Sequence, residues 1–350
     1  MAEKGMIQTV LGHIRPEALG RTLCHEHLHI DSGPLGIATD PCSHHHSKIN
    51  DPIVMKNLGW IRQYPYYHKP NLSIVDESEA VIEEMKYYKA NGGSSIVDNT
   101  VIGLNPNVEF LKKVSEQSGV NIIAGTGFYV DITHSDETRK TPSEKLASIM
   151  EHDIISGVGT SGIHCGVIGE IGCSWPLTDS ERKVLRAAGM TQEHTGCPII
   201  IHPGRNPKAP AEILRILTEA GAKADQIVIS HLDRTLLDKE SILEFAEMKS
   251  YCEFDLFGIE TSHYQQEENI DMPSDAQRIE RIGWLIDAGF QDKITISHDI
   301  HTKHRLMKYG GHGFSHILLN IVPMMKTRQI SEDVINKILI ENPKKWLAFK

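Results

Sequence analysis

Short runs of β-branched and other apolar residues recur along this chain, separated by longer segments in which apolar residues return every three to four positions. The first pattern predicts strands, and the second predicts helices that bury one face. Ile199-Ile200-Ile201 and Ile227-Val228-Ile229 are apolar without a break, as expected for parallel strands that are covered on both faces. The expected strands are residues 21–30, 95–100, 121–129, 166–172, 198–202, 226–231, 251–257 and 293–298.

Helical periodicity lies between these strands. The expected helices are residues 77–90, 107–118, 142–155, 179–193, 210–220, 239–248 and 276–288. Eight strands that alternate with helices predict an α/β protein of the TIM (β/α)8-barrel class, whose active site lies at the carboxyl ends of the strands. A doubly wound open sheet is the alternative, but it would not bring the first, fourth, fifth, sixth and eighth strands to one point.

Two connections are much longer than the others. Residues 31–76 follow the first strand and are rich in Gly, Pro, His and Tyr, and residues 300–328 follow the eighth strand. Long loops on the active face of a barrel often close over a substrate, so both segments are predicted lids. We interpret His44-His45-His46, in the first of them, as part of a solvated loop rather than as a metal site.

Composition favours one catalytic domain with a small ligand. The 350 residues are 40% hydrophobic and 23% charged, which is enough to bury a large core, and residues 1–350 are expected to form a single domain. A formal net charge of -10 and a pI near 6.0 argue against nucleic acid or a membrane surface as the main partner. A homo-oligomer stays open, because oligomeric state cannot be read from this sequence.

The expected compartment is the cytosol. The amino-terminal segment has no uninterrupted apolar stretch, and no part of the chain approaches the roughly 20 apolar residues that a membrane span needs. The six cysteines form no CxxC pair and mostly lie in or beside expected strands. We interpret them as reduced core thiols.

Histidines at the strand ends are candidate metal ligands. His25 and His27 are two apart on one strand, so their imidazoles face the same side and can chelate one cation. His202 and His231 each end an apolar strand and can supply a second cation. One histidine of 20 carries little weight alone. Nitrogen and oxygen ligands that converge from several strand ends, however, predict a binuclear hydrolytic metal centre.

Two carboxylates complete the expected site. Glu170 lies in a buried run, where an unpaired carboxylate would be costly, and two cations would remove that cost while its oxygens bridge them. A core salt bridge is the alternative, although Gly169 and Gly172 favour a site of close approach. Asp299 supplies a further oxygen near a bridging water. We expect two divalent ions and favour zinc, although manganese, cobalt and iron accept the same ligands.

These residues carry a resemblance to the phosphotriesterase family of the amidohydrolase superfamily over essentially the whole chain. The segments that match it are residues 10–12, 20–27, 168–176, 201–205, 230–234, 298–303 and 341–343. The ligand sets that the resemblance implies are His25, His27 and Asp299 for one metal, His202 and His231 for the other, and Glu170 as the bridge.

Two departures from the bacterial organophosphate-hydrolysing pattern narrow the expected activity. That pattern has a lysine carboxylated by carbon dioxide where this chain has Glu170, which offers the same negative charge and two bridging oxygens. On the seventh strand, Asp255 is followed by Leu256, where the bacterial pattern has the histidine of a proton shuttle. Organophosphate turnover is therefore not the expected main activity.

The resemblance to a phosphotriesterase-related subgroup implies hydrolysis of N-acetyltaurine and related N-acyl taurines. Cationic residues follow several ligand positions, and such a ring would select a small anion such as a sulfonate or carboxylate. The alternative is that these side chains decorate solvent-facing loops, and that Tyr129, at the end of the third strand, only packs. The expected substrate contacts are Tyr129, Arg205, Arg234, His301 and Lys303.

The expected reaction is hydrolysis of a small anionic amide by a hydroxide that bridges the two metals. Asp299 and Glu170 are the expected catalytic residues, with Asp299 accepting the proton and returning it to the departing nitrogen. A lactonase, a carboxylesterase or a weak phosphotriesterase would use the same centre. A metal-binding scaffold without turnover is the alternative from another class, and the complete ligand set counts against it.

Overall fold

Eight parallel strands form the centre of the molecule. The computed structural model describes residues 3–36, 48–261, 264–267 and 269–350. Each strand of the sheet pairs with the next one along the chain. The strands are β3 (Thr22–Glu26), β4 (Ser95–Asp98), β5 (Asn121–Thr126), β6 (Val167–Gly172), β7 (Ile199–His202), β8 (Ile227–Ile229), β9 (Tyr251–Phe254) and β10 (Ile294–Ile296).

The first and last strands of this sheet meet. β3 and β10 lie side by side, and the backbone amide of Asp299 donates a hydrogen bond to the carbonyl oxygen of His25 at 3.0 Å. Each of the eight expected runs contains one strand. The predicted (β/α)8 barrel is confirmed, and the alternative of an open doubly wound sheet is wrong.

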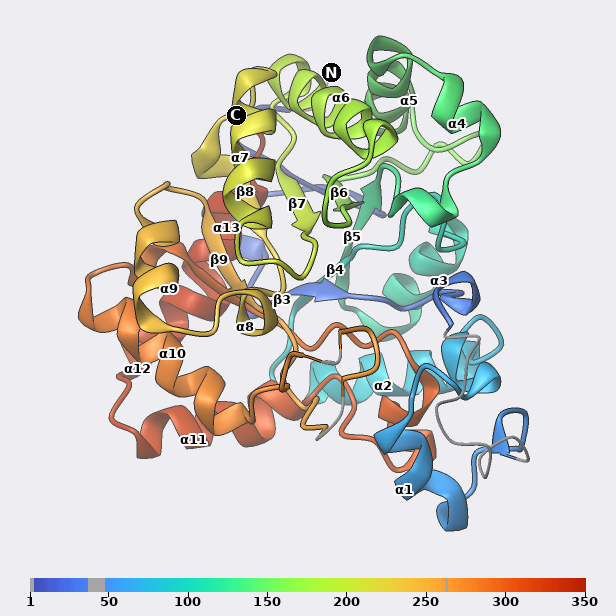
Figure 1. Cartoon of the computed structure of the whole chain (residues 1–350), viewed down its shortest axis with the longest axis vertical. Helices are drawn as coiled ribbons and strands as arrows, with labels where there is room; N and C mark the ends of the chain where they lie inside the picture. The colour runs from blue at the N-terminus through green and yellow to red at the C-terminus, as the bar shows by residue number, and fades with distance from the viewer. Residues whose placement is uncertain (1–2, 37–47, 262–263, 268) are drawn as a thin grey trace.

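Helices surround the strands on the outside (Figure 1). The expected helices are all present, as α2 (Ser78–Ala90), α3 (Val108–Ser118), α5 (Ser143–Ile155), α6 (Asp179–Thr195), α7 (Ala209–Glu219), α9 (Lys239–Ala246) and α10 (Asp275–Asp287). Shorter helices lie in the connections and near the carboxyl terminus, namely α1 (Met55–Gln63), α4 (Asp136–Lys140), α8 (Leu232–Thr235), α11 (Val322–Thr327), α12 (Glu332–Asn336) and α13 (Asn342–Leu347). The apolar pattern does not predict the amino-terminal hairpin of β1 (Ile7–Thr9) and β2 (Gly12–Ile14).

Helix α6 shows how local sequence sets an element's limits. The Thr178 hydroxyl accepts a hydrogen bond from the Glu181 amide at 3.1 Å, and the Glu181 carboxylate accepts one from the Thr178 amide at 3.0 Å. This reciprocal pair satisfies two amides that the first turn leaves open. The helix ends at Gly196, whose φ is 70°, and a Cβ there would lie 2.0 Å from the carbonyl oxygen of Lys350. Only glycine fits that position.

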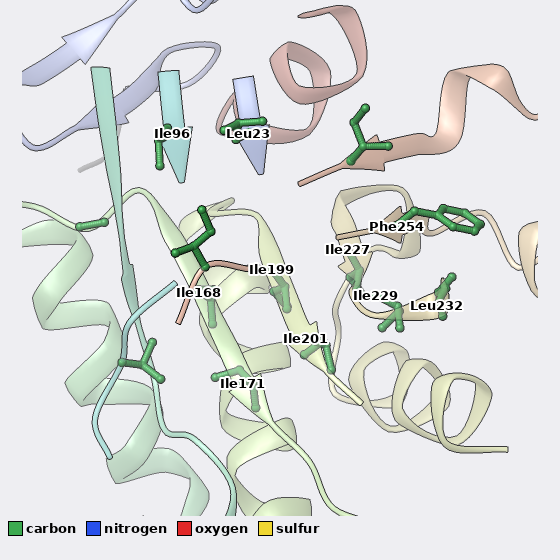
Figure 2. Close-up of a cluster of buried hydrophobic side chains, with 14 of the residues drawn as sticks. Leu23, Ile96, Ile168, Ile171, Ile199, Ile201, Ile227, Ile229, Leu232 and Phe254 are labelled. Atoms are coloured by element: carbon green, nitrogen blue, oxygen red, sulfur yellow. The ribbon is translucent and has the colours of Figure 1, made fainter. Parts of the chain in front are cut away.

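Side chains of the strands alternate between two apolar clusters. Figure 2 shows Ile199, Ile201, Ile227 and Ile229 in the larger cluster, which includes helix residues. The intervening residues belong to the smaller cluster, which fills the barrel together with residues from α13 and the amino-terminal segment. Its members are Ile7, Leu19, Cys24, Val97, Ile123, Val167, Ile200, Val228, Tyr251, Trp346 and Leu347. The opposite end of the barrel, where the strands' carboxyl ends meet, is left to polar side chains.

The two long connections contain short helices. The first holds α1, and the second holds 3-10 turns at Lys303–Arg305 and Met307–Tyr309, a π-helix at Ile317–Ile321 and α11. His44-His45-His46 and Cys42 lie outside the described residues, so their interpretation stays a prediction. Among the helices that the structure describes, none is both long and apolar enough to cross a membrane.

Candidate metal centre

The six predicted ligands converge at the carboxyl ends of five strands. All six side chains are buried. In the order of the strand that carries or precedes them, they are His25 and His27 (β3), Glu170 (β6), His202 (β7), His231 (β8) and Asp299 (β10). Close groups among them are His25, His27 and Asp299, and His25, Glu170 and His231, whose ligand atoms lie within 4.8 Å of one another.

Irregular pairing redirects side chains on two of the ligand-bearing strands. The pairing of β3 with β4 shifts register between Leu23 and Glu26, and that of β6 with β7 shifts between Ile168 and Ile171. Such irregularities re-aim side chains and recur beside active sites. They fall where His25 and Glu170 turn into the polar end of the barrel.

Glu170 lies among four imidazoles. Its Oε1 is 3.2 Å from Nε2 of His27. Its Oε2 is 3.3 Å from Nε2 of His25, 3.1 Å from Nδ1 of His202 and 3.8 Å from Nε2 of His231. Oε1 therefore faces His27 and Oε2 faces His25, His202 and His231, so one carboxylate lies close to all four imidazoles.

Asp299 is held beside this group by a buried carboxylate of β3. Its Oδ1 lies 3.2 Å from Nε2 of His27. The segment around it is anchored by Glu26, which accepts hydrogen bonds from the His298 amide at 2.9 Å, the Ile300 amide at 3.0 Å and the Ser297 hydroxyl at 2.8 Å. Glu26 thus positions Asp299 without itself facing the other ligands.

Two of the candidate ligands have left-handed backbone conformations. The φ of His231 is 55° and that of Asp299 is 52°. Each such residue costs about 1–3 kcal/mol and persists only where its surroundings enforce it. The His231 amide donates to Asp255 Oδ1 at 3.0 Å, and the Asp299 amide donates to the His25 carbonyl at 3.0 Å. These bonds hold both side chains toward the centre.

The proton positions on His25 fit a metal ligand. The Ser230 hydroxyl donates to Glu253 at 2.8 Å, so its oxygen is left to accept from Nδ1 of His25 at 3.0 Å. Asp255 Oδ2 also lies 2.9 Å from that Nδ1. Nε2 of His25 then carries the lone pair, and this buried atom has no hydrogen-bond partner among the described residues. A cation bound between this nitrogen and the facing carboxylates would supply the missing partner.

His202 and His231 lie against each other at the same end of the barrel. Nδ1 of His231 donates to Asp255 at 2.8 Å, which leaves a lone pair on its Nε2. That Nε2 lies 2.8 Å from Nδ1 of His202. Arg234 donates toward Nε2 of His202 at 3.3 Å, so Nδ1 of His202 carries a proton that lies between the two rings, and a bound cation would take the place of that proton. The residues present therefore fit divalent metal ions.

The charges of the site follow from burial and from these contacts. Burial opposes the ionisation of Glu170, but the neighbouring imidazoles of His25, His202 and His231 outweigh it and hold its pKa well below the usual range. Burial likewise opposes the ionisation of Asp299, but His301 and His27 hold its pKa well below the usual range. Both carboxylates are anionic at neutral pH.

A cavity of about 530 Å³ opens above this centre. Four of the five predicted substrate residues line it, namely Tyr129, Arg205, Arg234 and His301. The hydroxyl of Tyr129 lies 3.1 Å from Nδ1 of His202. The fifth residue, Lys303, is not among the lining residues, because its ammonium pairs with Asp76 at 2.6 Å and with Glu77 at 3.0 Å.

Loops supply cavity residues that the sequence did not single out. Tyr66 comes from the first long connection, and Tyr264 comes from the connection after β9. Tyr66 stacks on His301 with ring centroids 5.9 Å apart. Neither tyrosine follows a strand end or belongs to a motif. The clustering of Tyr in residues 31–76 is the one signal that points toward Tyr66.

The fold is a (β/α)8 barrel, and histidine and carboxylate side chains gather at the carboxyl ends of its strands. These two features together indicate a hydrolase with a candidate metal centre. The model of the Phosphotriesterase family matches residues 5–347, and the chain belongs to this family.

Similar proteins cover the same length. N-acetyltaurine hydrolase of Mus musculus is 55% identical over 346 residues, and that of Homo sapiens is 54% identical over 346 residues. Each alignment covers 99% of both chains. Among solved structures, a resiniferatoxin-binding protein from Rhodobacter sphaeroides superimposes with a TM-score of 0.94 at 29% identity, over 98% of this chain and 95% of that one.

Proposed function

We propose that this protein is a metal-dependent amidohydrolase that cleaves N-acetyltaurine and related small anionic N-acyl amines to a carboxylate and the free amine. The observation that carries the proposal is the position of Glu170 among four imidazoles on the floor of a cavity that also contains arginine. The activity named for the mouse and human relatives supports the substrate.

We propose zinc as the metal and two ions as the number, with the ligands divided as the family resemblance implies. His25, His27 and Asp299 would hold one ion, His202 and His231 the other, and Glu170 would contact both. When bound, these ions supply the Lewis acidity that ionises water near neutral pH and polarises a carbonyl group.

Asp299 is the proposed proton carrier. Its carboxylate is anionic and accessible from the cavity, and Oδ2 lies 3.2 Å from Nδ1 of His301. It accepts the proton of the attacking water and returns it to the departing nitrogen. An alkyl amine is a very poor leaving group without that proton.

Tyr129 is the proposed hydrogen-bond donor to the substrate's carbonyl oxygen. Burial, together with the charges of Glu170 and Asp299, raises its pKa well above the usual value, so its hydroxyl stays protonated. That hydroxyl lies beside His202 and lines the cavity. A donor placed where negative charge develops lowers the barrier of acyl transfer.

Elemental analysis coupled to incubation with N-acetyltaurine tests site and substrate together. We expect bound zinc and release of taurine and acetate, and we expect the metal-free protein to be inactive until zinc is restored. A parallel screen of lactones and aryl esters separates the amidohydrolase from a lactonase or carboxylesterase. Metal-loaded protein that cleaves no member of these classes would support the scaffold alternative instead.

We also propose that residues 1–350 act as one hydrolase domain in the cytosol. The family match over residues 5–347 supports the single domain. Among the residues that the structure describes, five cysteines are free and all are buried, which supports a reducing compartment. A small-molecule substrate is the expected partner, and measurement of the mass in solution tests for a homo-oligomer.

A further inference from the structure

The cationic residues near the cavity differ in what their nitrogen atoms already bind. Arg234 is buried, and its terminal nitrogens lie 3.3 Å from the Thr235 hydroxyl and 3.2 Å from the Pro203 carbonyl oxygen. Lys303 is held outside the cavity by its two carboxylates. Both cations therefore have protein acceptors.

Nδ1 of His301 has a protein acceptor as well. It donates to the carbonyl oxygen of Asp299 at 2.7 Å, and its Nε2 lies 3.2 Å from the hydroxyl of Tyr66. His301 is thus tied to the proposed proton carrier on one side and to a tyrosine on the other. It is poorly placed to bind a second anion.

Arg205 is different. Its Nε donates to the hydroxyl of Tyr264 at 2.8 Å, and the guanidinium lies 5.3 Å from the centre of that ring. Among the described residues, its terminal nitrogens have no hydrogen-bond acceptor, and no carboxylate forms an ion pair with it. A half-buried guanidinium that lines a cavity without a counter-charge attracts an anion from solution.

Tyr264 adds a donor at the same place. Because its oxygen accepts from Nε of Arg205, its hydroxyl proton is left for another acceptor. Its ring packs with Leu256 and Met272, which hold it against the cavity wall. The guanidinium and the tyrosine hydroxyl therefore present several donors side by side.

We propose that Arg205 and Tyr264 form the subsite for the anionic head group of the substrate's amine portion, and that this head group is a sulfonate. Two sulfonate oxygens accept from the terminal nitrogens of Arg205, and the third accepts from the hydroxyl of Tyr264. The inference rests on the proposed function for the amide, but the anion subsite itself does not require turnover.

The test compares Arg205→Met, Arg205→Lys and Tyr264→Phe with the wild type. Substrates are N-acetyltaurine and N-ethylacetamide, which lacks the sulfonate. We expect Arg205→Met to lower the ratio of kcat/KM values for these two amides about 10- to 100-fold, mainly through KM, as loss of charged hydrogen bonds predicts. Tyr264→Phe should lower it about 3- to 10-fold. Arg205→Lys should restore part of the loss.

Arg215→Met is the matched control. Arg215 lies on α7, is exposed, and pairs with Glu212 and Glu219. This substitution also removes one positive charge, but it does so away from the cavity. The ratio of the two kcat/KM values and the KM for N-acetyltaurine should therefore stay at the wild-type values. A ratio in Arg205→Met equal to that of the wild type would overturn the subsite.

Calorimetric titration with ethanesulfonate separates this inference from the proposed function. If the wild type cleaves neither amide, the proposed function fails, yet ethanesulfonate binding that weakens about 10-fold or more in Arg205→Met still supports the subsite. No ethanesulfonate binding by the wild type, or equal binding by wild type and Arg205→Met, overturns it. If Arg205→Met does not fold, the same comparison is made with Tyr264→Phe, and unchanged binding there overturns it.

Discussion

Asp255 organises the histidines of both proposed metal sites, and its replacement by asparagine is the most direct test of that arrangement. The carboxylate accepts from Nδ1 and from the amide of His231, at 2.8 and 3.0 Å, and lies 2.9 Å from Nδ1 of His25. Burial opposes its charge, but His231 and His25 hold its pKa below the usual range. It therefore fixes a proton on Nδ1 of His231, and its charge favours a proton on Nδ1 of His25.

The size of the effect follows from these contacts. Asparagine has one acceptor oxygen and one donor nitrogen, so when its oxygen keeps the bonds to His231, an N–H group replaces the charged oxygen that faces Nδ1 of His25. Loss of a residue that hydrogen-bonds to a metal ligand typically lowers metal affinity about 10- to 100-fold, which corresponds to about 1.4–2.7 kcal/mol of binding free energy. We expect Asp255→Asn to weaken zinc binding by this factor.

The assay is a competitive titration of zinc against a chelator, with thermal unfolding of the metal-free protein measured in parallel. Asp275→Asn is the control, because Asp275 is also buried and pairs with Arg278 at 2.8 Å and His316 at 2.8 Å but contacts none of the proposed ligands. It should lower the unfolding temperature without changing zinc affinity. Wild-type zinc affinity in folded Asp255→Asn would refute the reasoning.

Three further outcomes are expected. Asp299→Asn should lower kcat about 10²- to 10⁴-fold, far more than it lowers metal content, as loss of an acid–base group predicts, and wild-type turnover by the metal-loaded variant would exclude the proton-carrier role. Glu170→Ala should lose metal in elemental analysis and unfold at a lower temperature, whereas full metal content would remove the bridging assignment. Burial raises the pKa of Glu84 to about 7, so the stability that its neutral form contributes is complete below pH 4.5 and is lost as pH rises through 7. Glu84→Gln should therefore flatten the dependence of unfolding temperature on pH between about 4.5 and 7, and an unchanged slope would contradict this.

Most of the fold and the polar centre could be predicted from periodicity and residue type. The apolar run around Ile200 predicted β7, and the structure places that strand within the expected residues. Glu170 and the four histidines were found because each stands at a strand end, and a closed barrel brings strand ends together. Both predictions need only the spacing of residues along the chain and the fact that a closed barrel brings its strand ends together.

Other features were not accessible in this way. Glu26 is the last residue of β3 and Asp255 directly follows β9, and both support the ligands from behind, where nothing in their local sequence distinguishes them from other buried acids. Tyr264 reaches the cavity from a long connection whose course depends on its packing with Leu256 and Met272. Lys303 has the same local context as the other cationic candidates, yet its ammonium turns to Asp76 and Glu77.

The amino-acid sequence by itself determined the alternation of strand and helix and the chemical types of the side chains at the strand ends, because both depend on spacing along the chain. The tertiary structure alone decided which charges are neutralised. Arg205 differs from Arg234 and Lys303 because of acceptors contributed by other segments. A charge is available to a ligand only when neighbours brought by the fold leave it without a partner, and that depends on distances in space.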